Sequence, residues 1–230
     1  PVWRHWLDEL GGRYTFVRYD GRGSGLSDWD VADLSIEACV ADLATVVDSL
    51  GLARFPLLGL SRGAAVAIAY AVAHPERVSG LVLCGGFALG RYKRSPAAAE
   101  EAAMFLELVR LGWGQESSAF RQVYTTLFIP HGTPEQVQWW NDLQRISTSP
   151  DVAVRLQAEA FATDVAELAP RVTAPALILH AEHDAVVPFA EGRRLAALIP
   201  GARFVPLPGA NHVLLADEPA WPRFLAEVSG

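Results

Sequence analysis

Residues 55–75 read FPLLGLSRGAAVAIAYAVAHP, and this stretch gives the strongest indication of the fold. An apolar run enters Gly59-Leu60-Ser61-Arg62-Gly63, and an alanine-rich helical pattern follows at once. A G-x-S-x-G pattern between strand and helix is typical of a sharp turn that lifts a serine hydroxyl clear of a sheet. We expect the glycines where the backbones of strand and helix nearly touch. The alternative is that Ser61 only caps the helix; the strand before it and the helix after it favour a nucleophile.

Around this turn, short apolar runs alternate with helical periodicity, which predicts an α/β protein with a mostly parallel sheet flanked by helices. The expected strands are residues 15–19, 55–60, 78–84, 176–180 and 203–206. The expected helices are residues 2–10, 35–50, 62–74, 189–199 and 220–228, with Ser35 as an N-cap and Gly51 as a stop.

Between residues 87 and 173 the rhythm changes to helical patterns without a convincing strand, broken near residues 112–114, 131–134 and 147–150. This pattern predicts a helical cap inserted between two strands. The expected division is residues 1–86 as the first part of the core, 87–173 as the helical cap insertion and 174–230 as the second part of the core.

Composition excludes several classes. With 51% hydrophobic residues in 230 and a net charge of −7, the chain has material for a core and does not favour nucleic acid as a partner. Neither a membrane span nor a signal peptide is visible, so we expect a cytoplasmic protein. Cys39 and Cys84 are interpreted as packed thiols in a reducing setting. No cofactor and no metal is implied, and the oligomeric state stays open, a homodimer being one alternative.

A serine hydroxyl needs a histidine base and an acid that orients it. Of six histidines, His180, His183 and His212 fall near the carboxyl ends of strands, where open α/β sheets place their sites. Asp184 follows a buried strand; alone, it could equally be a turn residue. The order Ser61, Asp184, His212 is the order expected of a nucleophile-elbow hydrolase.

Five stretches together carry a resemblance: YDGRGSGLSD, LLGLSRGAA, AHPERVSGLVL, LILHAEHDAVVP and PGANHVLLADEP. Over nearly its whole length the chain resembles α/β-hydrolase fold enzymes, and it is similar to bacterial hydrolase-like domains, some joined to regulatory or cyclase modules. The resemblance implies Ser61 as nucleophile, Asp184 as orienting acid and His212 as general base. It also implies that the backbone N–H of Arg62 is one oxyanion donor.

The resemblance further implies a structured loop that contains Asp20, Arg22, Gly23 and Gly25. Its glycines follow the G-x-G-x-G spacing, and Leu26 stands where the dinucleotide fingerprint needs its third glycine. We therefore interpret this loop as a tight structural turn.

The start of the chain departs from the family pattern, which has two or three further strands, one ending in a loop that donates the second oxyanion N–H. The strand between residues 15–19 and 55–60 is missing. We expect that an N-terminal segment is absent from the given sequence; direct pairing of those two strands would contradict this. The only His-Gly pair, His131-Gly132, lies in the predicted cap, and we interpret it as unrelated to the loop that donates the second oxyanion N–H.

The cap is rich in large rings, which at helical spacing are more typical of the cap's own core than of a ligand surface: Phe105, Trp113, Phe120, Tyr124, Phe128, Trp139 and Trp140. A cap over a serine site still makes the pocket largely apolar, which favours a small apolar or aromatic ester, lactone or diketone. Arg62 and Arg121 could meet a substrate carboxylate, but we expect them to be solvated.

These observations predict a serine hydrolase that cleaves a small carboxyl ester, lactone or related carbonyl substrate through an acyl-enzyme. Acyl transfer, carbon–carbon bond hydrolysis and perhydrolysis would use the same triad. A non-catalytic ligand-sensing domain of a regulatory protein is the alternative from another class.

Overall fold

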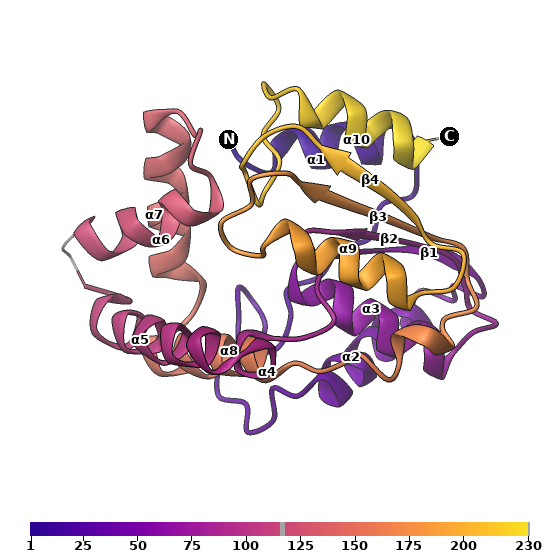
Figure 1. Ribbon diagram of the computed structural model, residues 1–230, viewed down its shortest axis with the longest axis horizontal. Helices are drawn as coiled ribbons and strands as arrows, with labels where there is room; N and C mark the ends of the chain where they lie inside the picture. The colour runs from indigo at the N-terminus through magenta and orange to yellow at the C-terminus, as the bar shows by residue number, and fades with distance from the viewer. Residues whose placement is uncertain (116–117, 230) are drawn as a thin grey trace.

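A computed structural model describes residues 1–115 and 118–229; residues 116 and 117, inside the predicted cap, and residue 230 lie outside the described residues. The centre is a parallel sheet of four strands in the order β1-β2-β3-β4 (Figure 1). These strands are β1 (Phe55–Leu60), β2 (Val78–Cys84), β3 (Ala176–Ala181) and β4 (Arg203–Leu207). The predicted α/β class is therefore confirmed, with four strands within one residue of their expected bounds.

Helices cover both faces of the sheet (Figure 1). One face carries α1 (Arg4–Gly11) and α10 (Ala220–Ser229); the other carries α2 (Ile36–Ser49), α3 (Arg62–Ala73) and α9 (Phe189–Leu198). Apolar strand residues alternate between the two layers, so that Leu81 and Leu83 pack toward α3 while Leu179 and Leu207 pack toward α1 and α10.

The capping predictions for α2 are confirmed. The Ser35 hydroxyl accepts a hydrogen bond from the Ala38 N–H at 3.2 Å, and Gly51 takes a left-handed φ of +64° after the helix. An N-cap oxygen and a glycine stop satisfy backbone groups that a helix end leaves unpaired.

The prediction of a strand at residues 15–19 is wrong. That segment has no sheet ladder, and Val17 and Tyr19 are exposed, while Phe16 packs below α1 and α10. A β-rich composition forms a strand only where a neighbour accepts its hydrogen bonds, and β1 is an edge strand of the described sheet. The segment does not pair with β1, so the outcome that would contradict a missing neighbouring strand is not observed; the missing segment itself stays a prediction.

Between β2 and β3 the chain forms a group of helices beside the carboxyl end of the sheet (Figure 1): α4 (Arg91–Arg94), α5 (Pro96–Gly112), α6 (Ser118–Phe128), α7 (Pro134–Ser147) and α8 (Pro150–Ala162). The three predicted breaks fall at the ends of these helices. Ser95, Thr133 and Ser149 cap the helices that follow, each with proline in the first turn. We keep the name cap for residues 87–173; the short 3-10 helix η1 (Ala169–Arg171) near its end packs against the core.

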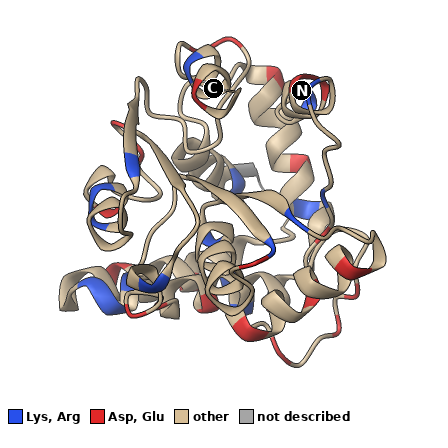
Figure 2. Ribbon diagram, turned by 90° about the vertical axis from the view of Figure 1, so that its right-hand side faces the viewer, with Lys and Arg blue, Asp and Glu red and all other residues tan. Residues whose placement is uncertain are grey.

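Within the described residues, no helix is both long enough and apolar enough to cross a membrane. Figure 2 shows acidic and basic residues scattered over helices and loops. Of the four strands, only β4 contains a charged residue, Arg203 at its start. The buried sheet is therefore apolar, and polar chemistry is confined to the ends of its strands.

Candidate active site

The predicted turn after β1 is strongly bent. Ser61 has φ +55° and ψ −125°, and it alone among the described non-glycine residues has a positive φ. Its side chain makes no capping hydrogen bond to α3, so the interpretation of Ser61 as a helix cap is wrong. A serine held in this sparsely populated conformation is the geometry expected of a nucleophile elbow.

The two glycines of the turn have different roles. A Cβ on Gly59 would lie 2.6 Å from the Gly63 carbonyl oxygen and 2.7 Å from the Ala64 Cα, so strand and helix touch there. A Cβ on Gly63 would meet nothing within 4 Å. The expected close approach is therefore correct for Gly59 and wrong for Gly63.

Asp184 and His212 meet beside the carboxyl ends of β3 and β4. The His212 Nδ1 and the Asp184 Oδ2 lie 2.6 Å apart, and both side chains are buried. The other carboxylate oxygen, Oδ1, accepts hydrogen bonds from the N–H groups of Val186 (2.8 Å) and Val187 (2.9 Å). Because one oxygen is held by backbone, the other is fixed as the acceptor for the imidazole N–H.

His212 is held by backbone and ring contacts. The backbone N–H of His212 donates to the Phe128 carbonyl at the end of α6 (2.8 Å). The Phe128 ring meets the imidazole edge-on, with 5.4 Å between the ring centroids. A Cβ on Gly85 would lie 3.0 Å from the imidazole Cε1. The Nε2 of His212 is buried without a hydrogen-bond partner in the described residues. This nitrogen is therefore available to a reacting group.

The other histidines near the strand ends are occupied or remote from the cavity. His180 is fully buried; its Nε2 lies 2.9 Å from the Val187 carbonyl and 3.6 Å from the Asp184 Oδ2, and burial lowers the pKa of His180. His183 is exposed. His131, in the cap, donates its backbone N–H to the side-chain Oδ1 of Asn211 at 3.0 Å. Of the three candidates, only His212 combines an acid partner with a free Nε2.

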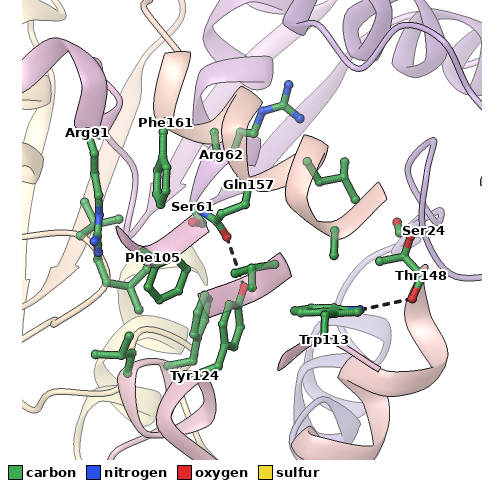
Figure 3. Close-up of a pocket in the computed structure, with 18 of the residues that line it drawn as sticks. Ser24, Ser61, Arg62, Arg91, Phe105, Trp113, Tyr124, Thr148, Gln157 and Phe161 are labelled. Carbon is green, nitrogen blue, oxygen red and sulfur yellow. Dashed lines mark hydrogen bonds between the residues drawn. The ribbon is translucent and has the colours of Figure 1, made fainter. Parts of the chain in front are cut away.

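A cavity of about 310 Å³ lies between the elbow and the cap, and its lining includes Ser61, Phe128, Val186 and Val187. Figure 3 shows Ser61 in this pocket with the cap residues Phe105 and Tyr124. Phe128 contacts His212, and Val186 and Val187 contact Asp184, so the cavity lies next to these two residues as well as to Ser61. Of the seven cap rings named from the sequence, four line it: Phe105, Trp113, Tyr124 and Phe128. These four rings pack against one another, as the interpretation of them as the cap's own core expected, but they also face the cavity. Trp140 is buried in a separate cluster, as that interpretation expected.

The loop at residues 20–25 is a tight turn, as predicted. Gly23 and Gly25 have φ of +80° and +62°, and Arg22 binds Asp42 through two nitrogens at 2.6 and 2.7 Å. The Thr148 hydroxyl donates to the Gly23 carbonyl at 2.6 Å. The loop thus connects the core to the cap.

The sequence reasoning did not single out two arginines of α4, Arg91 and Arg94, which line the cavity. A cluster of basic residues directly after an apolar strand and loop was the available signal. The expectation that Arg62 and Arg121 are solvated is wrong: Arg121 is buried, and Arg62 donates to the Leu34 carbonyl at 2.6 Å.

The remaining candidate groups are the Cys84 thiol and clusters of metal-binding side chains. Cys84 ends β2, and burial raises the pKa of its thiol to about 12, which agrees with a packed thiol. Within residues 1–115 and 118–229, no group of three or more His, Cys, Asp or Glu side chains is placed to hold a metal ion.

The fold and this site define a hydrolase of the α/β-hydrolase fold. The chain belongs to the serine aminopeptidase S33 family, whose model matches residues 5–219. It is 26% identical over 223 residues to the pyrrolizixenacetamide deacetylase of Xenorhabdus hominickii, covering 94% of this chain and 80% of that protein.

Two solved structures are similar over almost the whole chain. The enol-lactonase from Burkholderia xenovorans LB400 is 25% identical with a TM-score of 0.83, covering 99% of this chain and 84% of that one. A thermophilic esterase from Thermogutta terrifontis is 27% identical with a TM-score of 0.77, covering 99% and 83%.

Proposed function

We propose that this hydrolase cleaves a small carboxyl ester or lactone through an acyl-enzyme on Ser61. The observation that carries the proposal is the 2.6 Å contact between His212 Nδ1 and Asp184 Oδ2, together with an Nε2 that has no partner in the described residues. A proton on Nδ1, donated to the carboxylate, makes Nε2 the acceptor. An imidazole in this tautomer accepts a proton from a serine hydroxyl. Ser61 lines the cavity next to this base, and its hydroxyl is the one that the base would serve.

Each step balances. The Ser61 hydroxyl gives its proton to His212 Nε2 while Oγ bonds to the substrate carbonyl carbon. The bond from that carbon to the alcohol oxygen then breaks, and the alcohol leaves with the proton from His212. A water gives a proton to His212 and its oxygen bonds to the acyl carbon; the bond to Oγ breaks, Oγ regains the proton and the acid leaves.

The negative charge on the carbonyl oxygen needs donors in both steps. Arg62 is the first residue of α3, so its N–H has no acceptor inside the helix and lies at the positive end of the helix dipole. We assign this N–H as one oxyanion donor.

The substrate class follows from the cavity walls and from the relatives. Aromatic and aliphatic side chains make up most of the lining, so a small apolar acyl or aromatic group would be desolvated there. The similar proteins are a deacetylase, an enol-lactonase and an esterase, all of which act at a carbonyl carbon. We therefore favour a neutral carbonyl as the reacting group.

The test is covalent labelling together with turnover. A fluorophosphonate probe should label the wild type at Ser61, and 4-nitrophenyl esters of two to eight carbons should be hydrolysed. Ser61→Ala should abolish both, with hydrolysis falling at least roughly 10³-fold. Ser24→Ala is the matched control because Ser24 also lines the cavity, and this variant should still be labelled. A folded wild type that neither labels nor turns over would contradict the proposal and favour a ligand-sensing domain.

A further inference from the structure

The short helix α4 contributes two guanidinium groups to the wall of the cavity. The Arg91 guanidinium lies over the rings of Phe105 and Phe161, 5.7 and 5.3 Å from their centroids, and donates from Nη2 to the Val186 carbonyl at 3.1 Å. Figure 3 shows Arg91 beside these two rings in the same pocket as Ser61. A cation is thus built into a wall that is otherwise largely apolar.

The two arginines differ in how their charge is balanced. Arg94 lies 3.8 Å from the carboxylate of the buried Glu191 and also donates to the Leu89 carbonyl at 2.8 Å. Arg91 takes part in none of the ion pairs found in the described residues. Burial lowers the pKa of both guanidinium groups, yet an arginine remains charged in proteins. Among residues 1–115 and 118–229, no adjacent carboxylate therefore balances the positive charge of Arg91.

The acidic groups that act on Arg91 from a distance are not free to pair with it. Glu101 lies on the exposed side of α5, where water screens it. Asp184 already binds His212 and the N–H groups of Val186 and Val187. The remaining cavity arginine, Arg62, is turned to the Leu34 carbonyl.

A half-buried cation with one neutral acceptor is stabilised when an anion enters beside it, because the cost of desolvating the guanidinium is then offset. We propose that the substrate of this site carries a free carboxylate, which binds Arg91 while the ester or lactone carbonyl lies at Ser61. This inference rests on the proposed function and narrows its substrate class. A carboxylate fits the planar fork of a guanidinium with two parallel hydrogen bonds.

The charge count favours a carboxylate over a phosphate. A phosphate monoester carries nearly two negative charges and three acceptor oxygens, which would need several donors. Arg91 provides one unbalanced charge, and its neighbours Phe105 and Phe161 offer ring faces to a hydrocarbon spacer. The substrate is therefore a half-ester, or a lactone with a carboxylate side chain, with an apolar segment between its two ends.

The experiment compares charged and neutral members of two substrate pairs. Mono-4-nitrophenyl glutarate and its methyl ester place the charge on the acyl side; 4-acetoxybenzoate and its methyl ester place it on the leaving group. Initial rates give kcat and KM for the wild type, Arg91→Gln, Arg91→Lys and Arg94→Gln. Arg94→Gln is the matched control. It removes a guanidinium from the same helix and the same cavity, but this guanidinium already has a carboxylate partner.

In at least one of the two substrate pairs, Arg91→Gln should lower kcat/KM for the charged member by roughly 10- to 100-fold, mainly through a higher KM. A hydrogen bond to a charged group contributes a binding free energy of this size. The neutral member should change by less than about threefold, and Arg91→Lys should recover part of the loss. Arg94→Gln should change both members of each pair equally.

If Arg91→Gln changes both members equally in both pairs, or the wild type prefers the neutral member in both, the carboxylate proposal is wrong. The hydrolase proposal survives those outcomes as long as Ser61→Ala is inactive. Should Arg91→Gln not fold, inhibition of neutral-ester hydrolysis in the wild type decides. Competitive inhibition by glutarate but not by 1,5-pentanediol supports the proposal, and no difference between the two overturns it.

Discussion

The two sides of the cavity hold their functional groups in different ways. On the core side, backbone geometry does most of the positioning: Ser61 has a positive φ, two N–H groups bind Asp184, and His212 donates its N–H to the Phe128 carbonyl. On the cap side, side chains such as Arg91 and Tyr124 form the wall directly. Substitutions on the core side should therefore lower turnover of every substrate, whereas substitutions in the cap should change which substrate is bound.

The largest effect is expected at Asp184. In Asp184→Asn, the amide oxygen can still accept from the Val186 and Val187 N–H groups, so its NH₂ faces His212 Nδ1. The imidazole must then carry its proton on Nε2 and cannot accept one from Ser61. We expect kcat to fall by roughly 10³- to 10⁴-fold on charged and neutral esters alike.

The measurement is steady-state hydrolysis of a neutral 4-nitrophenyl ester, with near-UV circular dichroism as a control for folding. A folded Asp184→Asn protein that loses less than about tenfold in kcat would mean that Asp184 does not orient the base. An effect confined to KM would move Asp184 to the substrate-binding side of the comparison.

Next in size is the pair of elbow glycines. Gly59→Ala forces a methyl group against the backbone of α3 at 2.6 to 2.8 Å, which should destabilise the fold by about 3 kcal/mol and displace Ser61. Gly63→Ala meets open space in the first turn of the helix and should be neutral or stabilising by up to about 1 kcal/mol. Urea denaturation of both variants tests this. Equal destabilisation would show that the elbow is not held by the contact at Gly59.

A smaller and more selective effect is expected from Tyr124 in the cap. Its hydroxyl donates to the Gln157 Oε1 at 3.4 Å, a long hydrogen bond across the cavity. Tyr124→Phe keeps the ring and its stacking on Phe128, at 4.7 Å between centroids, so kcat should stay within about twofold. KM should change by up to roughly fivefold, in a direction that depends on substrate polarity. A drop in kcat above tenfold would place Tyr124 among the groups that touch the reacting atoms.

The same contrast explains how much the sequence could predict. The elbow, Asp184 and His212 lie in short segments next to strands, so periodicity and chain order suffice to locate them. The role proposed for Arg91 could not be predicted, because it depends on the rings of Phe105 and Phe161 and on the lack of an ion-pair partner among the described residues, none of which is local in sequence. Residues 15–19 were mistaken for a strand because composition does not reveal whether a neighbour is present to pair with.

The smallest effect on turnover is expected where the two sides meet, at Glu218. Its Oε1 accepts from the Leu215 N–H (2.5 Å) and its Oε2 from the Asn211 Nδ2 (3.0 Å), while Asn211 Oδ1 accepts from the His131 N–H of the cap (3.0 Å). Burial raises the pKa of Glu218 from 4.5 to about 7, against the lowering effect of these hydrogen bonds. Between those values the folded protein retains a proton that the unfolded chain has released.

The contribution of Glu218 to the free energy of unfolding should therefore fall as pH rises from about 4.5 to about 7, because the folded state binds the extra proton in that window. Glu218→Gln cannot ionise, so its urea midpoint should depend less on pH across the same window, although it weakens the bond to Asn211. Glu100→Gln, at an exposed position of α5, is the control and should keep the wild-type slope. If the urea midpoints of Glu218→Gln and the wild type depend on pH in the same way, ionisation of Glu218 does not contribute to the pH dependence of stability. The expected result is that the urea midpoint of Glu218→Gln depends less on pH than that of the wild type, while turnover at pH 5 is unchanged. This result would show that the network supports the junction of core and cap and takes no part in the chemistry at Ser61.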